Sequence, residues 1–201
     1  MLRVSDLSCV RGDRSLFSGV QFAVEPGQWL HVRGANGCGK TSLLRLLAGL
    51  SQPAHGEIRW DGEPVARDAQ AFRSELLYLG HHAAVKEELT AIENLQLASE
   101  LDGVELTRAE AVQALKRFGL QGREDLPVRF LSAGQKRRVL LARLVARKAR
   151  LWILDEPFTA LDAKAVQMLG NLIGEHVEDG GMAIVTSHQQ IPIGGGKELD
   201  L

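Results

Sequence analysis

A glycine-rich loop that ends in a lysine is the feature that most restricts the fold of this chain. Residues Gly34–Thr41 read GANGCGKT and stand between a β-like run at Gln28–Arg33 and a helical pattern at about Lys40–Leu50. Glycines allow the backbone to curl so that successive N–H groups point inward at phosphate oxygens, and the following helix adds the positive end of its dipole. A strand, this loop and a helix in this order predict an α/β protein that binds phosphate.

Two side chains of the loop have expected roles of their own. The ammonium group of Lys40 is expected to reach the β- and γ-phosphates of a nucleotide, and the hydroxyl group of Thr41 to ligate Mg²⁺. A chance glycine-rich turn is a poor alternative, because the whole pattern is matched between a strand and a helix. The candidate nucleotide-binding residues are Gly34, Ala35, Asn36, Gly37, Cys38, Gly39, Lys40, Thr41 and Ser42.

Two adjacent carboxylates follow a second β-like run. Leu151–Leu154 are all apolar, which favours a buried strand, and Asp155 and Glu156 come directly after them. The carboxyl ends of strands are where open α/β sheets bind ligands. Asp155 is therefore a candidate Mg²⁺ ligand, and Glu156 is the candidate base that polarises the water attacking the γ-phosphate.

Composition excludes several other classes of protein. The 201 residues carry 24 Lys+Arg and 25 Asp+Glu, so a formal net charge of −1 gives no general attraction to nucleic acid. Two cysteines are too few for a disulfide framework and favour a reducing compartment. The most apolar helical stretch, Ser42–Leu50, contains Arg45 and is shorter than the ~20 residues that a membrane span needs. The N-terminus has no signal-peptide pattern, and any membrane role is expected to come through another chain.

Hydrophobic periodicity predicts an α/β core interrupted by a helical insert. We expect a core lobe at about residues 1–83 and 150–201 and a helical subdomain at about 84–149. The tail around Gly194–Gly196 is expected to be loosely held. Predicted strands are Leu2–Leu7, Val20–Val24, Gln28–Arg33, Glu57–Trp60, Leu76–Gly80, Leu151–Leu154 and Met182–Thr186. Predicted helices are Lys40–Leu50, Ala91–Leu101, Arg108–Phe118, Ser132–Lys148 and Lys164–His176.

A third motif indicates the family. Leu131–Gln135 read LSAGQ at the start of a helical pattern, Phe158–Asp162 read FTALD, and Thr186–His188 close the last apolar run. These segments resemble the signature, the D-loop and the switch histidine of the ABC ATPases, in the order of that family. For Ser132 alone, an ordinary helix N-cap would be the simpler interpretation.

The resemblance implies a fold and a mechanism. The fold would be a P-loop NTPase of the ABC type, with an N-terminal antiparallel β region, a RecA-like core and an inserted helical subdomain. The chain would hydrolyse MgATP as a homodimer coupled to an integral-membrane permease, and His188 would contact the γ-phosphate. The signature residues of one protomer, Ser132, Gly134 and Gln135, would bind the γ-phosphate held by the other.

Two positions depart from the usual pattern of the family. The segment that commonly carries an adenine-stacking aromatic residue corresponds to Leu7–Gly12 here, which contains no aromatic residue. Two alternatives are open: Arg11 would stack on the base through its guanidinium group, or the base would be held loosely. The position of the usual Q-loop glutamine, eight residues before Leu89, is occupied by His81. An imidazole can accept a hydrogen bond from water, which makes His81 a candidate catalytic residue. His81 and His82 alone are too few ligands for a closed metal site.

Within the family, the chain is most similar to the ATPases of cytochrome c maturation haem exporters. The similar segments are Tyr78–Leu95, Leu131–Val139 and Leu151–Asp162. The resemblance implies haem-handling maturation proteins as further partners and a peripheral position at the cytoplasmic face of the bacterial inner membrane. His81–Glu88 would contact the permease.

Other functions remain open from the sequence. An ABC exporter ATPase for a lipid or a drug would have the same motifs. A non-transport ABC protein usually has two nucleotide domains or a long coiled-coil insertion, and this sequence has neither. A kinase built on the same loop is disfavoured by the signature motif.

Overall fold

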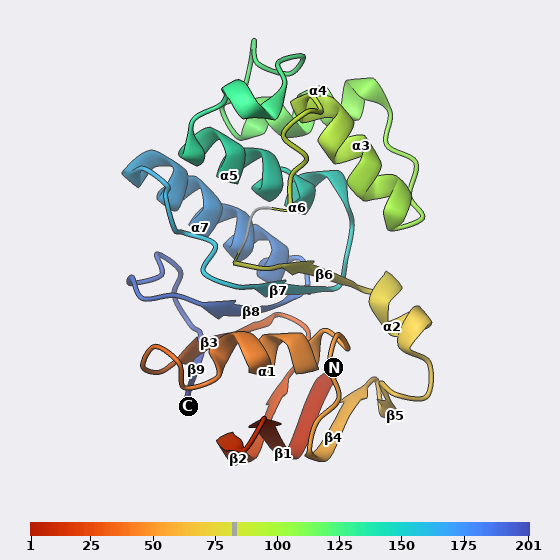
Figure 1. Cartoon of the computed structure of the whole chain (residues 1–201), viewed down its shortest axis with the longest axis vertical. Coiled ribbons are helices and arrows are strands. Elements are labelled where there is room, and N and C mark those ends of the chain that lie inside the picture. The colour runs from red at the N-terminus through yellow and green to blue at the C-terminus, as the bar shows by residue number, and fades with distance from the viewer. Residues whose placement is uncertain (82–83) are drawn as a thin grey trace. The chain divides into compact units, whose positions relative to one another are not determined.

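The computed structural model describes residues 1–81 and 84–201, which divide into two compact units. The first unit contains residues 1–78, 149–157 and 169–201, and the second contains residues 79–148 and 158–168. Residues 79–81 and 158–168, which the sequence predicts to lie in the core lobe, group with the second unit. Figure 1 labels the elements of both units.

An antiparallel sheet forms one layer of the first unit. Its order is β2-β1-β4-β5, with β1 at Leu2–Arg11, β2 at Arg14–Val24, β4 at His55–Trp60 and β5 at Glu63–Pro64. The first two strands extend well beyond the ranges that periodicity predicts, because the β1–β2 hairpin continues to the pair Arg11–Arg14. Buried side chains of β1 such as Leu2 and Val4 belong to the hydrophobic core of this unit.

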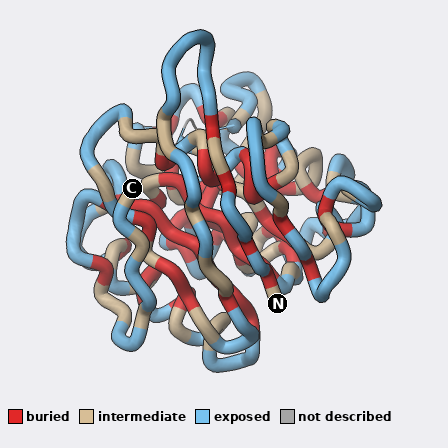
Figure 2. Tube along the Cα trace, turned by 90° about the horizontal axis from the view of Figure 1, so that it is seen from below, coloured by how far each residue is buried: buried red, intermediate tan, exposed pale blue. Residues whose placement is uncertain are grey.

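The second sheet of this unit positions the candidate site. Its order is β6-β7-β8-β3-β9, with β6 at Leu76–Leu79, β7 at Leu151–Leu154, β8 at Met182–Thr186, β3 at Gln28–Arg33 and β9 at Lys197–Asp200. Strands β7, β8, β3 and β9 pair in parallel. Every residue of β7 and β8 is buried, as is typical of central parallel strands. In Figure 2 the buried positions, drawn in red, follow the strands beside the N-terminus, whereas the connecting loops are exposed.

Helices α1, α2 and most of α7 complete the first unit. α1 spans Lys40–Leu47, α2 spans Ala69–Ser74 and α7 spans Ala163–Glu178. Periodicity did not predict α2, a short helix in which Phe72 is the buried residue. The side chain of Asp68 accepts a hydrogen bond from the N–H of Ala71 and caps this helix.

The prediction that the C-terminal tail is loosely held was wrong. Lys197–Asp200 form β9, which pairs with β3 from Leu30 to Arg33. β9 is mostly exposed and polar, so it lacks the apolar pattern by which a strand is recognised in a sequence. Backbone hydrogen bonds hold β9 in place, because it pairs with N–H and C=O groups at the edge of β3 that would otherwise lack partners.

The second unit is helical. Its elements are α3 (Ala91–Leu101), α4 (Arg108–Arg117), the 3₁₀ helix η1 (Val128–Phe130), α5 (Ala133–Leu141) and α6 (Arg143–Ala146). α3, α4 and α5 each begin with a capping box, in which a Ser or Thr side chain and a Glu or Gln side chain satisfy N–H groups of the first turn.

The single helix predicted over Ser132–Lys148 is two helices. α5 ends at Leu141, α6 follows Ala142, and Arg147 is already extended. The carboxylate of Asp102 pairs with both Arg143 and Arg147 and holds this end of the chain in place. Among the residues that the structure describes, no helix is both long and apolar enough to cross a membrane.

Candidate nucleotide-binding and catalytic site

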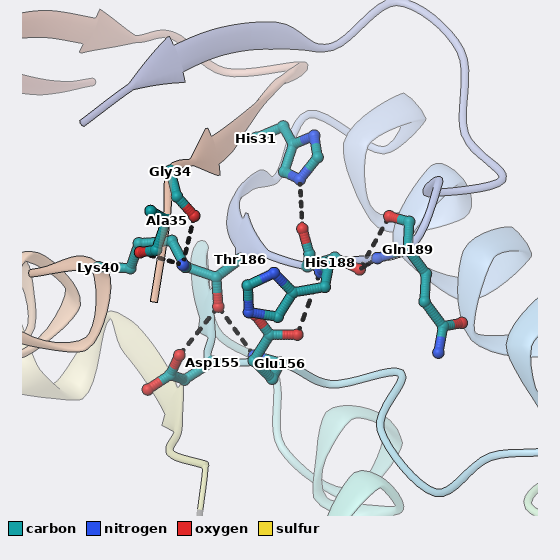
Figure 3. Close-up of polar contacts among 10 residues, drawn as sticks. His31, Gly34, Ala35, Lys40, Asp155, Glu156, Thr186, His188 and Gln189 are labelled. Atoms are coloured by element: carbon teal, nitrogen blue, oxygen red, sulfur yellow. Dashed lines mark hydrogen bonds and ion pairs between the residues drawn. The ribbon is translucent and has the colours of Figure 1, made fainter. Parts of the chain in front are cut away.

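The phosphate loop, Gly34–Thr41, connects β3 to α1 as predicted from the sequence. The side chain of Lys40 is buried and folds back over the loop, where its ammonium group donates hydrogen bonds to the carbonyl oxygens of Gly34 at 2.7 Å and Ala35 at 3.2 Å (Figure 3). The ammonium group of Lys40 thus places a positive charge next to the backbone of the loop. This arrangement is suited to an anionic phosphate group.

Two glycines of the loop occupy positions that other residues could not fill. Gly34 has a φ of 145°, and a Cβ there would lie 2.7 Å from Sγ of Cys38 and 2.8 Å from the carbonyl oxygen of Leu201. Gly39 has a φ of 113°, and a Cβ there would approach the ring of Phe17 to 3.0 Å. Both positions need the left-handed backbone and the small volume of glycine.

Asp155 and Glu156 leave the carboxyl end of β7 and are joined through the buried Thr186 at the end of β8. The hydroxyl group of Thr186 donates to Oδ1 of Asp155 at 2.9 Å and accepts from the N–H of Glu156 at 2.8 Å. Glu156 has a φ of 49°, a left-handed conformation that a non-glycine residue rarely adopts and that is typical of functional sites. One hydroxyl group therefore orients both members of the acidic pair.

This role of Thr186 was missed by sequence reasoning. The motif Thr186–His188 pointed only to the histidine, because no local pattern shows that a residue thirty positions away would meet the carboxylates. A hydroxyl residue at the carboxyl end of a fully apolar run was the one available signal, since buried hydroxyl groups need partners.

His188 lies beside Glu156, as Figure 3 shows. Its backbone N–H donates to Oε2 of Glu156 at 3.3 Å, and Nε2 of its ring lies 3.4 Å from Oε1 of the same carboxylate. The side chain of His188 is 54% exposed and that of Glu156 is 14% exposed. The structure therefore brings the candidate base and the candidate switch histidine together in the first unit.

Tyr78 on β6 interacts electrostatically with Asp155. Burial, and secondarily the charge of Asp155, raise the pKa of its phenol group. The hydroxyl group thus stays protonated next to the candidate metal ligand.

The signature segment lies in the second unit. The side chain of Ser132 accepts from the N–H of Gln135 at 3.3 Å, and Oε1 of Gln135 accepts from the N–H of Ser132 at 2.9 Å. Ser132 is thus a helix N-cap, as the simpler interpretation held, and it is also exposed at the positive end of α5. A Cβ at Gly134 would lie 3.0 Å from the carbonyl oxygen of Ala160 in the predicted D-loop, so the two motifs adjoin.

The predicted D-loop ends at a carboxylate with its own partners. Asp162 caps α7 by accepting from the N–H of Ala165 at 2.8 Å and pairs with the guanidinium group of Arg138 on α5. These contacts, first the backbone hydrogen bond and then the Arg138 charge, lower the pKa of Asp162.

The remaining predicted site residues lie in both units. Arg11 is exposed at the end of β1 in the first unit. His81 is exposed in the second unit, and the guanidinium group of Arg137 donates to its carbonyl oxygen at 3.4 Å. His82, the second member of the histidine pair, lies outside the described residues. Cys38 is partly buried in the phosphate loop and Asn36 is exposed.

Two oxygen donors of the first unit fit a magnesium ion. Within residues 1–81 and 84–201, no group of three or more His, Cys, Asp or Glu side chains could hold a metal. Mg²⁺ typically takes one or two protein oxygens and completes its shell with phosphates and water. Thr41, exposed at the start of α1, and Asp155, oriented by Thr186, are oxygen donors of this kind.

Comparisons with known proteins give the family of the chain. The model of the ABC transporter family matches residues 17–159. The cytochrome c biogenesis ATP-binding export protein CcmA of Dechloromonas aromatica is 54% identical over 100% of both chains, and that of Nitrosospira multiformis is 54% identical over 94% of this chain and 92% of its own. The solved structure of an ABC transporter ATP-binding protein from Pyrococcus furiosus aligns with a TM-score of 0.86 at 26% identity, covering 100% of this chain and 96% of that one. The chain therefore belongs to the ABC transporter family as an ATP-binding, ATP-hydrolysing subunit of the CcmA type.

Proposed function

We propose that this chain binds MgATP at the phosphate loop and hydrolyses it with Glu156 as the general base. The observation that carries the proposal is the meeting of Asp155, Glu156, Thr186 and His188 at the carboxyl ends of β7 and β8, in the same unit as the buried Lys40. A cation, a metal-binding carboxylate and an oriented base are the parts that phosphoryl transfer to water needs.

Each residue of the proposed site has a role in binding or hydrolysing ATP. Backbone N–H groups of Gly34–Thr41 and the ammonium group of Lys40 hold the phosphates, and the neighbouring side chain of Ser42 belongs to the same cradle. Thr41 and Asp155 would hold Mg²⁺, which would neutralise the negative charge of the phosphates. Glu156 accepts the proton of the attacking water, and His188 hydrogen bonds to the γ-phosphate across from it. Arg11, exposed at the end of β1, is the proposed neighbour of adenine.

The second half of each ATP site comes from another copy of the chain. Ser132, Gly134 and Gln135 present a hydroxyl group and the N-terminus of α5, which suit an anion but lie in a different unit from the phosphate loop. In a homodimer, these residues of one protomer bind the γ-phosphate held by the other. ATP then favours the closed dimer, and hydrolysis reopens it.

The output of this cycle is proposed to be cytochrome c biogenesis at the cytoplasmic face of the bacterial inner membrane. The support is that the similar relatives are named cytochrome c biogenesis ATP-binding export proteins. The permease partner would contact His81–Glu88, between the core lobe and the helical subdomain at about 84–149. Haem-handling maturation proteins would complete the assembly. Co-purification with these proteins, or with a permease of another kind, tests this part of the proposal.

The replacement Glu156→Gln tests the catalytic assignment. It keeps the shape of the side chain but removes the base, so phosphate release from MgATP is expected to fall by about 10² to 10⁴, while ATP binding persists. Glu178→Gln, at the exposed end of α7, is the matched control and keeps the wild-type rate. A wild-type rate in Glu156→Gln would contradict the assignment.

The same assay tests His81 at the Q-loop position. If His81 accepts a hydrogen bond from the attacking water, His81→Leu, which removes the acceptor, slows phosphate release, and His81→Gln, which keeps an acceptor, retains most of the rate. Equal rates in the two variants would remove His81 from the catalytic site.

A further inference from the structure

The segment that follows β8 is anchored on side chains of β3. The indole N–H of Trp29 donates to the carbonyl oxygen of Gly194 at 3.0 Å, and Gly196 lies so close to the Trp29 ring that a Cβ there would approach it to 2.4 Å. At the other end of the segment, Nε2 of His31 lies 3.2 Å from the carbonyl oxygen of Ser187. The segment that carries His188 is therefore held at both ends by side chains of β3.

The strand geometry explains why His31 reaches this position. In β3, Leu30 and Val32 are buried in the hydrophobic core. Trp29 and His31 alternate with them along the strand and therefore point to the opposite face of the sheet. There the His31 and Trp29 rings stack with their centroids 6.3 Å apart and an interplanar angle of 30°. A cavity of about 470 Å³ opens beside them and is lined by His31, His188 and Gln189 among others. His31 is partly buried, and Figure 3 shows it pointing toward the His188 segment.

A single peptide unit links His31 to the candidate base. The carbonyl oxygen of Ser187 and the N–H of His188 belong to the same planar peptide group. The carbonyl lies against His31, and the N–H donates to Oε2 of Glu156 at 3.3 Å. The side chain of Ser187 does not compete for this carbonyl, since its hydroxyl group is engaged with the backbone of Gln189. His31 and Glu156 therefore hold opposite sides of one peptide group.

A hydrogen bond to the carbonyl also strengthens the N–H on the other side. Hydrogen bonds in a chain polarise one another, and the peptide group transmits this effect from its oxygen to its N–H. The N–H of His188 thus becomes a better donor to the Glu156 carboxylate when His31 donates to Ser187. The ring of His31 must carry its proton on Nε2 for this contact, because a carbonyl oxygen can only accept.

We propose that His31 is a positioning residue for hydrolysis, which acts through the Ser187–His188 peptide to orient both Glu156 and the imidazole of His188. This inference rests on the proposed function of Glu156. His31 touches neither phosphate nor water in this role, so its loss affects the chemical step and leaves nucleotide binding at the phosphate loop intact.

Two variants of the full chain separate this role from a structural one. His31→Phe keeps an aromatic ring against Trp29 but removes the donor, whereas His31→Gln keeps an N–H near the position of Nε2. We expect His31→Phe to lower kcat for ATP hydrolysis about tenfold, the usual effect of one lost hydrogen bond, with KM for ATP within about twofold of wild type. His31→Gln is expected to restore most of kcat. Thermal unfolding of each variant checks that the fold is kept.

Three results would overturn the proposal. These are a wild-type kcat in His31→Phe, an equal loss of kcat in both variants, and a loss that lies in KM rather than in kcat. Failure of the proposed function would be recognised separately, because wild-type protein would then hydrolyse no ATP or Glu156→Gln would remain active.

Discussion

At the scale of single residues, the hydroxyl group of Thr186 is the point on which the acidic pair depends. It is fully buried, donates to Asp155 and accepts from the backbone of Glu156, whose φ of 49° is otherwise unfavourable. The direction in which Glu156 leaves β7 is therefore set by a residue of the neighbouring strand. Backbone strain of this kind persists only where the surroundings over-determine it.

Replacing Thr186 by valine is expected to disturb both carboxylates. Valine has nearly the same shape but leaves the N–H of Glu156 and one oxygen of Asp155 without this partner, which costs about 1–3 kcal/mol for a buried group. We expect the free energy of unfolding in urea to fall by about 2 kcal/mol and the rate of phosphate release to fall at least about tenfold. Thr186→Ser, which keeps the hydroxyl group, is the control. Equal behaviour of the two variants would show that the hydroxyl group is unimportant.

At the scale of elements, the end of α7 is joined to β7 and β8 through one aromatic stack. The ring of His176 stacks on Trp152 of β7 with centroids 3.8 Å apart and an interplanar angle of 1°, and its Nε2 donates to the carbonyl oxygen of Met182 at 3.2 Å. A Cβ at Gly181 would approach the ring to 2.3 Å, so the turn into β8 is shaped around this histidine.

The buried position of His176 predicts a pH-dependent stability. Burial lowers the pKa of its imidazole, against smaller opposing effects of the Met182 hydrogen bond and the charge of Asp179. The unfolded chain, with a histidine pKa of about 6.5, then binds the proton more readily than the folded chain. The contribution of neutral His176 is complete above about pH 6.5 and is lost as the pH falls from there toward the lower pKa of the folded state.

Urea unfolding of wild type and His176→Phe at a series of pH values tests this. Phenylalanine keeps the stack on Trp152 but does not titrate, so the free energy of unfolding should fall less steeply below about pH 6.5 than in wild type. Parallel curves for the two proteins would assign the pH dependence to other groups.

At the scale of the whole molecule, the two halves of the proposed ATP site belong to two different units of the chain. The phosphate loop and the acidic pair belong to the first, and the signature belongs to the second. The proposed homodimer uses both halves, since each protomer supplies one half to each of two symmetric sites.

The replacement Ser132→Asp tests this composite site. Aspartate caps a helix as well as serine does but places a negative charge where the γ-phosphate of the partner is expected, so hydrolysis should be lost with little change in thermal stability. Ser132→Asn, a neutral cap of the same size as aspartate, is the matched control and should lose less activity than the aspartate variant. Equal activity of the aspartate and asparagine variants would contradict a phosphate beside Ser132.

A mixing experiment extends this test to the dimer. Lys40→Ala, which lacks the phosphate-loop cation, and Ser132→Asp are each expected to be inactive alone. Mixed dimers hold one site with both halves intact, so an equal mixture should recover about a quarter of the wild-type activity if the sites act independently. No recovery in a mixture shown by sedimentation to contain dimers would count against shared sites.

The parts of this protein whose geometry is local can be predicted from the amino-acid sequence. The phosphate loop, the carboxylates after β7 and the capping box at Ser132 each lie within a few consecutive residues, so spacing alone fixes how their backbone groups converge. Three contacts could not be predicted and are seen in the folded chain alone. Thr186 bridges Asp155 and Glu156, His31 reaches the Ser187 carbonyl, and the polar tail forms β9 beside β3. These contacts join segments that are 30 or more residues apart. They depend on the order of the parallel strands, which is set when the strands bury their apolar faces and pair their edges. A short stretch of sequence does not contain this order.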